Sequence, residues 1–187
     1  MVTLINEYEQ AFESWLIDSR VQYVTVDQQK RRIFARNRIK SFDFLLYPAG
    51  FTPVIIAEVK GRKFKGTTLK NLTGLQCWVT MEDVQGLIRW EQVFGSEKPG
   101  HVTDAGYQAW FIFAYEFENV DVETDGRAVY DYRNRRYIFF AVRLDDYREF
   151  MTMRSPKWRT VTLPAAKFRE YAVPASQLLF QESSAKV

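Results

Sequence analysis

The chain has 187 residues, of which 47% are hydrophobic and 26% charged, so it is long and apolar enough for one ordinary domain over residues 1–187. One histidine (His101), one cysteine (Cys77) and a net charge of +3 exclude a disulfide framework, a structural zinc cluster and a multi-histidine metal site. Any metal would therefore be held mainly by oxygen, and we expect chemistry carried by carboxylates and amines.

The N-terminal part is predicted to contain one helix followed by three strands. Residues 3–18 place their apolar side chains on one helical stripe, which predicts an amphipathic helix. β-branched and aromatic residues predict strands over 21–26, extending as far as Phe34 in one interpretation, and over 42–47 and 54–60. Residues 48–53 hold two prolines and a glycine, which predicts a turn between the second and third strands.

The next predicted element is a helix that begins at a capping pattern, and further strands and helices follow it. Thr80 and Asp83 resemble a capping box and predict a helix that ends at Gly95, before a glycine-rich loop that reaches Gly106. A nearly continuous apolar run over 109–117 predicts a strand buried on both faces. Further elements are expected as strands at 137–144 and 158–163 and helices at 145–151 and 165–171. This order predicts an α/β fold with a mixed central sheet, its core over about 3–117 and a C-terminal extension over about 118–180.

Charge is strongly segregated along the chain. Residues 28–70 hold eleven basic residues and two acidic ones, a net charge of +9, and the two acids are Asp43 and Glu58. Residues 126–170 carry a further net charge of +6, and the acidic block 71–125 separates the two. Basic blocks brought together by folding would suit a polyanion such as nucleic acid, although solvated strand ends and turns would give the same pattern.

The strand over 54–60 carries the most informative residues. Side chains alternate along a strand, so Glu58 and Lys60 share a face with Val54 and Ile56. If the preceding turn is symmetric, Asp43 lies directly opposite Glu58, and two carboxylates in such a pair repel each other. A hard divalent cation between them would remove the repulsion, and oxygen ligands are those that Mg²⁺ selects. The alternative is a cross-strand salt bridge on a wet sheet face.

Lys60 would lie beside such a metal and any phosphate held there. An ordinary lysine is a cation, which would orient the attacking water or offset developing charge. Lys60 would act as a base only if burial and the metal depressed its pKa. These residues fit metal-assisted hydrolysis of a phosphodiester.

Asp43, followed after fourteen intervening positions by Glu58-Val59-Lys60 in two consecutive strands, resembles the PD-(D/E)XK nuclease superfamily, which includes restriction endonucleases and Holliday-junction resolvases. The resemblance implies a restriction-endonuclease-like core of helix, three strands, helix and strand. It implies that Asp43 and Glu58 ligate Mg²⁺, for which Mn²⁺ would substitute, that the Val59 carbonyl adds a ligand and that Lys60 is catalytic. It also implies a glutamate from the first helix near the metal. Glu9 fits best, with Glu13 or Glu7 left open, and an exposed helix position is an equal alternative for Glu9.

Several basic residues are candidates for phosphate contact. The predicted nucleic-acid-binding residues are Arg36, Arg38, Arg62, Lys63, Lys65, Arg135 and Arg136, each of which could instead be a solvated surface charge. Lys157, Trp158 and Arg159 combine basic and aromatic side chains in a way that suits backbone contact and base stacking. The equal alternative is a solubilising surface with Trp158 packed inside.

The leading hypothesis is a Mg²⁺-dependent nuclease that acts on DNA. The alternatives are a catalytically inactive nucleic-acid-binding or assembly module of the same fold, and a protein-interaction domain whose basic blocks meet an acidic partner. A homodimer is left open. The N-terminal residues include three glutamates with no basic lead-in before an apolar run, and no segment approaches the roughly 20 apolar residues that span a bilayer. We therefore expect a cytoplasmic protein with no membrane partner and a free thiol at Cys77.

Overall fold

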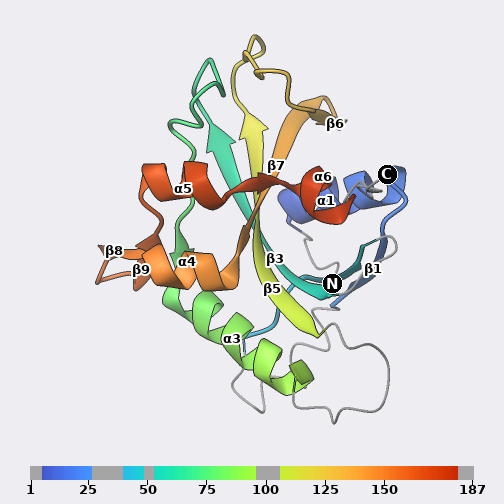
Figure 1. Ribbon diagram of the computed structural model, residues 1–187. Helices are drawn as coiled ribbons and strands as arrows, with labels where there is room; N and C mark the ends of the chain where they lie inside the picture. The colour runs from blue at the N-terminus through green and yellow to red at the C-terminus, as the bar shows by residue number, and fades with distance from the viewer. Residues whose placement is uncertain (1–5, 27–39, 49–52, 96–105, 181–187) are drawn as a thin grey trace, which may run out of the picture.

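A computed structural model describes residues 6–26, 40–48, 53–95 and 106–180. Figure 1 shows one mixed sheet with helices on both sides. The helices are α1 (Glu7–Asp18), α3 (Met81–Gly95), α4 (Leu144–Phe150), α5 (Ala165–Tyr171) and α6 (Ala175–Leu179). The strands are β1 (Gln22–Thr25), β2 (Phe44–Tyr47), β3 (Val54–Phe64), β4 (Val79–Thr80), β5 (Tyr107–Phe117), β6 (Tyr130–Tyr132), β7 (Arg135–Arg143), β8 (Thr152–Ser155), β9 (Thr160–Thr162) and β10 (Val173–Pro174).

Within the described residues the main sheet runs in the order β1-β2-β3-β5-β7-β10, and β6 pairs with β7. The long pairing of β3 with β5 is parallel, whereas the other pairings of this sheet are antiparallel. A second, smaller sheet has the order β4-β9-β8. The mixed α/β class predicted from the sequence is confirmed, and so is the order of helix, three strands, helix and strand.

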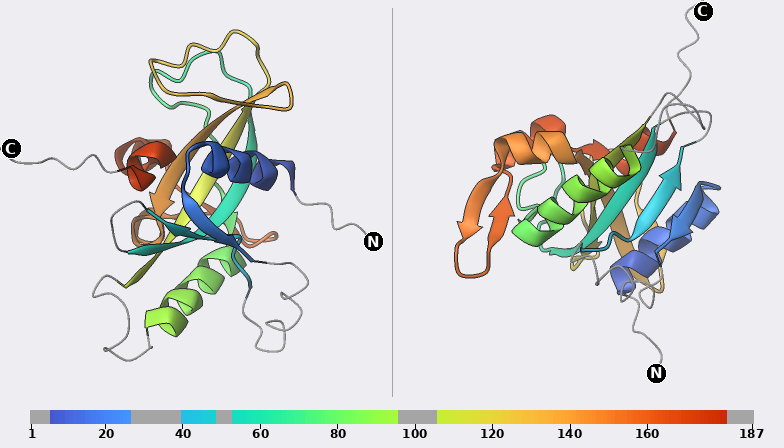
Figure 2. Two further views of the ribbon diagram at one scale, coloured as in Figure 1. Left: turned by 90° about the vertical axis from the view of Figure 1, so that its right-hand side faces the viewer. Right: turned by 90° about the horizontal axis from the view of Figure 1, so that it is seen from below.

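Two apolar layers sandwich the main sheet. One layer packs α1 and α6 against one face of the sheet and includes Phe12, Ala57 and Val59. The other lies under α3, α4 and α5 and includes Ile56 and Leu87. Figures 1 and 2 show the two groups of helices on opposite sides of the strands. Because side chains alternate along β3, the even-numbered residues 56, 58 and 60 face α3.

The register between β2 and β3 follows the symmetric turn predicted from the sequence. Phe44 pairs with Ala57, Leu45 with Ile56 and Leu46 with Ile55, all in antiparallel register. The same register extended by one position sets Asp43 opposite Glu58. The two candidate carboxylates therefore lie opposite each other, as the sequence predicted, although the paired residues of β2 and β3 end at Phe44.

Residues 118–180 add strands to the main sheet and side chains to its apolar layers. Strand β7 pairs along β5 over seven residues, and Phe140 and Phe168 belong to the central apolar layer. Strand β3 also runs four residues beyond Lys60, to Phe64. The expected 158–163 strand is shorter, because a turn occupies Trp158 and β9 begins at Thr160. Several short elements were missed, because two to five residues give no usable hydrophobic period: β4, β6, β8, β10 and α6.

The remaining expectations concern other parts of the chain. The extension of the first strand to Phe34 and the loop around His101 fall outside the described residues. Cys77 is a buried free thiol, as expected. None of the helices in the described part of the chain is long and apolar enough to cross a membrane.

Candidate active site

Asp43 lies where β2 begins, and both its main chain and its side chain join neighbouring strands. Its N–H donates to the Ala57 carbonyl at 3.0 Å, and its carbonyl accepts from the N–H of Val26 at 3.0 Å. Its Oδ2 accepts from the N–H of Val59 at 2.8 Å. The side chain therefore takes the place of a main-chain acceptor for β3, which fixes the carboxylate of this 7% exposed residue beside Glu58.

Glu58 and Lys60 point together toward helix α3. Glu58 is 6% exposed, and Lys60 Nζ donates to Glu58 Oε1 at 2.7 Å. This ion pair joins two residues of the same strand and not two strands, and the wet sheet face of the alternative is wrong, because the Glu58 side chain is 8% exposed and that of Lys60 16%.

Asp83 is a further member of the site that sequence reasoning placed only as a helix cap. It performs the capping role, since Thr80 N–H donates to Asp83 Oδ2 at 2.8 Å and Asp83 N–H donates to Thr80 Oγ1 at 3.1 Å. Its other oxygen, Oδ1, lies 3.0 Å from Lys60 Nζ and also forms an ion pair with Lys40. The capping pattern in the sequence identifies Asp83 as the helix cap. The contact between Asp83 and Lys60 arises only because α3 packs on β3.

The chain that leads into β2 is held against α3. Trp90 Nε1 donates to the Lys40 carbonyl at 2.8 Å. A Cβ added to Gly86 would lie 3.0 Å from the same carbonyl oxygen, so a glycine at this helical position permits the close approach. This packing brings the Lys40 amine to Asp83 and sets the path of the chain toward Asp43.

The electrostatics of the site follow from burial and from the charges of the neighbouring carboxylates and lysines. Burial and the neighbouring Asp43 charge raise the pKa of Glu58 to about 7, against the opposing effect of Lys60. Burial would raise the pKa of Asp83, but Lys60 and Lys40 outweigh it and lower that pKa to about 2. Burial would lower the pKa of Lys60, but Glu58 and Asp83 outweigh it and raise that pKa. Lys60 is therefore held as an ammonium group between these two carboxylates.

The donor set fits a hard divalent cation held by two carboxylates. Asp43 and Glu58 are buried acids whose mutual repulsion is visible in the raised pKa of Glu58. No group of three or more histidine, cysteine, aspartate and glutamate side chains is arranged for a metal among the described residues. Mg²⁺ commonly uses one or two carboxylates and completes its shell with water and substrate phosphate, so two carboxylates suffice. Val59 contacts Asp43 through its N–H, and the role of the Val59 carbonyl as a metal ligand stays a prediction.

The three glutamates of α1 that could lie near a metal have different neighbours. Glu7 pairs with Arg135 at 3.0 Å, and Glu13 accepts from the Tyr23 hydroxyl at 3.0 Å. Glu9 is half-buried, three residues ahead of Phe12. Helix α1 covers the Ala57 and Val59 face of β3, opposite the face of Glu58 and Lys60. The predicted role of Glu9 at a metal stays a prediction.

The predicted nucleic-acid contacts divide in a similar way. Arg62 donates to the carbonyls of Gly61 and Trp78 and stacks over the Trp78 ring at 3.8 Å, so its guanidinium is engaged inside the structure. Arg135 pairs with Glu7 and Glu116, and Arg136 donates to the Val120 carbonyl at 2.6 Å. Lys63 and Lys65 are exposed and share Glu118 at 3.6 and 3.7 Å. Arg36 and Arg38 lie outside the described residues.

Comparison with known proteins adds little beyond the fold. No protein-family model and no curated protein matches this chain. Among solved structures, Hjc, a Holliday junction resolvase from Archaeoglobus fulgidus, matches with a TM-score of 0.49 and 10% sequence identity over 92% of this chain and 93% of that chain. A likeness this distant supports no transfer of function, so the functional reasoning rests on the residues of the site.

Proposed function

We propose that this protein is a Mg²⁺-dependent nuclease that hydrolyses phosphodiester bonds in DNA. One observation carries the proposal: two buried carboxylates, Asp43 directly before β2 and Glu58 on β3, lie close together, and Glu58 contacts the ammonium group of Lys60. A sheet gains no stability from burying two like charges together, so the arrangement suits a bound cation. When bound, Mg²⁺ would supply Lewis-acid polarisation and lower the pKa of a water.

The residues of the chain have separate roles in this proposal. Asp43 and Glu58 hold the cation, and the hydrogen bond from Val59 orients the Asp43 carboxylate. Lys60, held between Glu58 at 2.7 Å and Asp83 at 3.0 Å, orients the attacking water and offsets charge that develops on the phosphate. Asp83 is a positioning residue, because it acts through Lys60.

A cleavage assay tests the proposal. Purified protein is incubated with single-stranded, duplex and branched DNA in MgCl₂ or MnCl₂, and cutting of at least one form is expected. Lys60→Met keeps the length of the side chain but removes its charge, and should reduce the rate by about 10²–10³. Lys70→Met is the matched control, since Lys70 is an exposed lysine that belongs neither to the site nor to the predicted nucleic-acid contacts. Full activity of Lys60→Met would contradict the mechanism.

An inactive nucleic-acid-binding module is the second candidate. It is favoured by the engagement of one oxygen of each carboxylate, Asp43 Oδ2 by Val59 and Glu58 Oε1 by Lys60. Calorimetric titration with Mn²⁺ separates the two functions. The nuclease requires binding to wild type that Asp43→Asn weakens, whereas equal or absent binding in both proteins favours the inactive module.

A further inference from the structure

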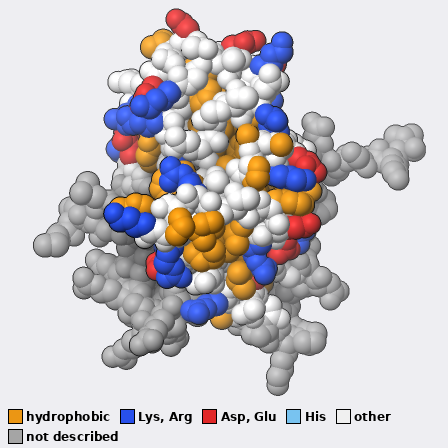
Figure 3. All heavy atoms as spheres, turned by 90° about the vertical axis from the view of Figure 1, so that its left-hand side faces the viewer, with side chains coloured by type: hydrophobic (Ala, Val, Ile, Leu, Met, Phe, Trp, Pro, Cys, Tyr) orange, Lys and Arg blue, Asp and Glu red, His pale blue; other side chains and the backbone are white. Residues whose placement is uncertain are grey.

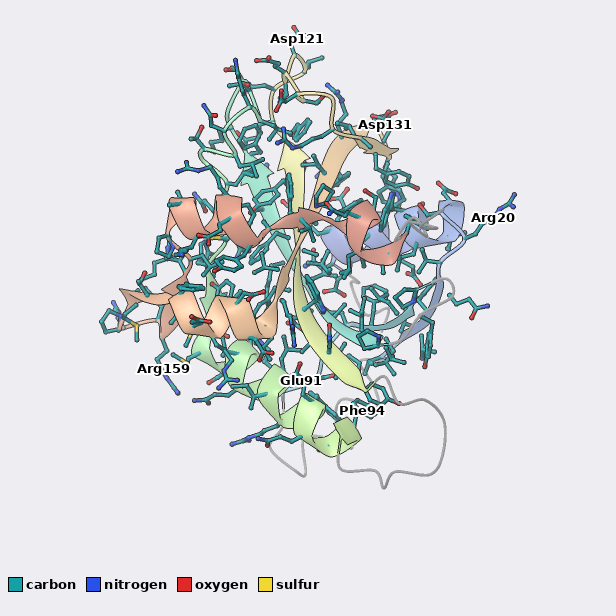
Figure 4. All side chains as sticks on the ribbon, viewed as in Figure 1. Arg20, Glu91, Phe94, Asp121, Asp131 and Arg159 are labelled. Atoms are coloured by element: carbon teal, nitrogen blue, oxygen red, sulfur yellow. The ribbon has the colours of Figure 1, made fainter. Side chains whose placement is uncertain are left out.

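A hairpin of β8 and β9 projects from the body of the protein beside α3. We name residues 152–162 the β8–β9 arm. Figure 2 shows the arm standing away from the main sheet, and Figure 4 shows Arg159 near the start of α3. Its turn is ordered by two hydrogen bonds, from the N–H of Arg159 to the Pro156 carbonyl at 3.2 Å and from the N–H of Trp158 to Ser155 Oγ at 3.4 Å.

The turn presents a large aromatic side chain to solvent. Trp158 is 70% exposed and Met153 is 56% exposed, so the alternative in which Trp158 packs inside the domain is wrong. Figure 3 looks onto this side of the molecule and shows hydrophobic side chains gathered in the middle, with lysine and arginine side chains around them. An exposed tryptophan on an ordered turn is a ready platform for a flat partner.

The charges on the arm are of one sign. Lys157 Nζ lies 5.3 Å from the centre of the Trp158 ring, and Arg154 and Arg159 flank the turn. The ion pairs between described residues include none made by Arg154 or Lys157, and the Arg159–Glu82 pair is loose, at 3.9 Å between two exposed side chains. This contrasts with Arg62, Arg135 and Arg136, whose guanidinium groups already have partners within the fold.

The arm is joined directly to the candidate active site. Thr80 pairs with Thr160, and Met81 N–H donates to the Arg159 carbonyl at 2.8 Å. Thr80 is also the capping partner of Asp83, which contacts Lys60. On the arm's inner side, the Trp78 ring has Arg62 at 3.8 Å and Arg154 at 5.0 Å from its centre. A nucleic-acid strand bound to the arm would therefore be held at a fixed position relative to Lys60.

We propose that the β8–β9 arm binds DNA by stacking Trp158 on an unpaired base while Arg154 and Lys157 contact the flanking phosphates. The proposal rests on the proposed function for the identity of the polyanion. A tryptophan ring can cover the face of an unpaired base, whereas the faces of bases inside a duplex are already stacked. The arm therefore points to DNA with single-stranded or branched character as the substrate class.

Fluorescence anisotropy with a labelled single-stranded 20-mer tests the arm. Binding is measured in EDTA, so that no cleavage occurs. Trp158→Ala should weaken binding about tenfold, and Trp158→Phe, which keeps an aromatic ring, should restore most of it. Val120→Ala removes a comparably exposed apolar side chain elsewhere and should bind as wild type does.

Salt dependence tests the cations. The double variant Arg154→Ala/Lys157→Ala should lower the slope of log affinity against log salt by about 0.7 for each charge removed. Lys70→Ala, an exposed charge far along the chain from the arm, should leave the slope unchanged. Binding of a blunt duplex should be weaker than that of the single strand and insensitive to Trp158→Ala.

The outcomes distinguish failure of the DNA-binding proposal for the arm from failure of the nuclease proposal. Equal affinity of wild type and Trp158→Ala for the single strand, or no binding by wild type, would overturn the arm, even if Lys60-dependent cleavage occurs. Sedimentation could instead show a wild-type dimer that Trp158→Ala dissociates. That result would also overturn the DNA-binding proposal, because the exposed side of the β8–β9 arm would then be an interface between two copies of the chain. Trp158-dependent binding without any Lys60-dependent cleavage would support the arm and contradict the nuclease.

Discussion

Lys60 Nζ lies 3.0 Å from Asp83 Oδ1, so the central strand β3 and the first turn of α3 are joined by a buried ion pair. The same Lys60 amine contacts Glu58 at 2.7 Å, and the same Asp83 caps its helix through Thr80. One carboxylate thus serves helix formation and the orientation of the candidate catalytic lysine. The two roles can be separated by substitution.

Asp83→Asn should destabilise the protein by about 2 kcal/mol at pH 7, because a pKa lowered from 3.8 to about 2 stabilises the ionised native form. The amide keeps an acceptor for the Thr80 N–H, so the loss reflects charge rather than capping. A lowered pKa contributes stability above the unfolded value, and that contribution disappears as the pH falls through 3.8 toward 2. Denaturant unfolding at pH 7 and pH 2.5 measures it, because most of the contribution is lost between these two values. Glu82→Gln, an exposed neighbour in the same turn, is the control and should change stability little.

Glu58→Gln should change how stability depends on pH in the absence of metal. The pKa of Glu58 is raised to about 7, so the native state holds this proton more tightly than the unfolded state does. Stability of the wild type should therefore fall as the pH rises from about 4.5 to 7 and above, and Glu58→Gln should lack this part of the fall.

Thermal melts from pH 5 to pH 8 measure the effect, with Glu118→Gln as a more exposed control. Mn²⁺ should raise the melting temperature of wild type at pH 8 and leave that of Glu58→Gln nearly unchanged. Parallel pH profiles for wild type and Glu58→Gln would contradict this account of the site.

Gly61→Ala should destabilise the fold by about 1–3 kcal/mol, because a Cβ at this position would lie 2.2 Å from the ring of Tyr8 on α1. The cost should fall below about 0.5 kcal/mol in a Tyr8→Ala background, where the ring is absent. Gly95→Ala is the control, since its Cβ would meet no atom of the described chain within 4 Å. Denaturant unfolding of the four proteins of this cycle tests whether α1 docks on β3 through this contact.

Tyr147→Phe should destabilise the protein by about 1–3 kcal/mol, because the buried hydroxyl lies 2.8 Å from the Cys77 carbonyl and 3.1 Å from the Val161 carbonyl. These carbonyls belong to the segments that carry β4 and β9, so the substitution should also loosen the β8–β9 arm. Hydrogen exchange of the Val161 amide reports the loosening. Tyr23→Phe removes a hydroxyl that is bonded near the surface to Glu13, and should cost less.

The candidate carboxylates could be predicted because their relation is local. The alternation of side chains along residues 54–60 placed Glu58 and Lys60 together, and the proline-rich turn set the register that brings Asp43 opposite Glu58. Both features depend on residues within about twenty positions of one another. Glu58 is buried on the face that it shares with Ile56, which is a local relation along one strand.

Other residues of the site could not be assigned from sequence, because their roles depend on distant packing. Asp83 has a complete local explanation as a helix cap, and nothing nearby in the chain indicates Lys60 as its partner. Arg62 is basic and follows the site directly, yet the Trp78 segment engages it internally. From the sequence, Trp158 was equally compatible with base stacking at the surface and with packing inside the domain. The turn between β8 and β9 exposes it to solvent.

The sequence alone determined a mixed α/β fold, a pair of carboxylates in the most basic part of the chain and a lysine on the same strand face, since period, turn chemistry and composition are local properties. Only the tertiary structure decided that α3 adds Asp83 to Lys60, that Arg62 is engaged inside the structure and that Trp158 faces solvent. These outcomes depend on which surfaces of distant elements pack together, and no local pattern encodes that choice.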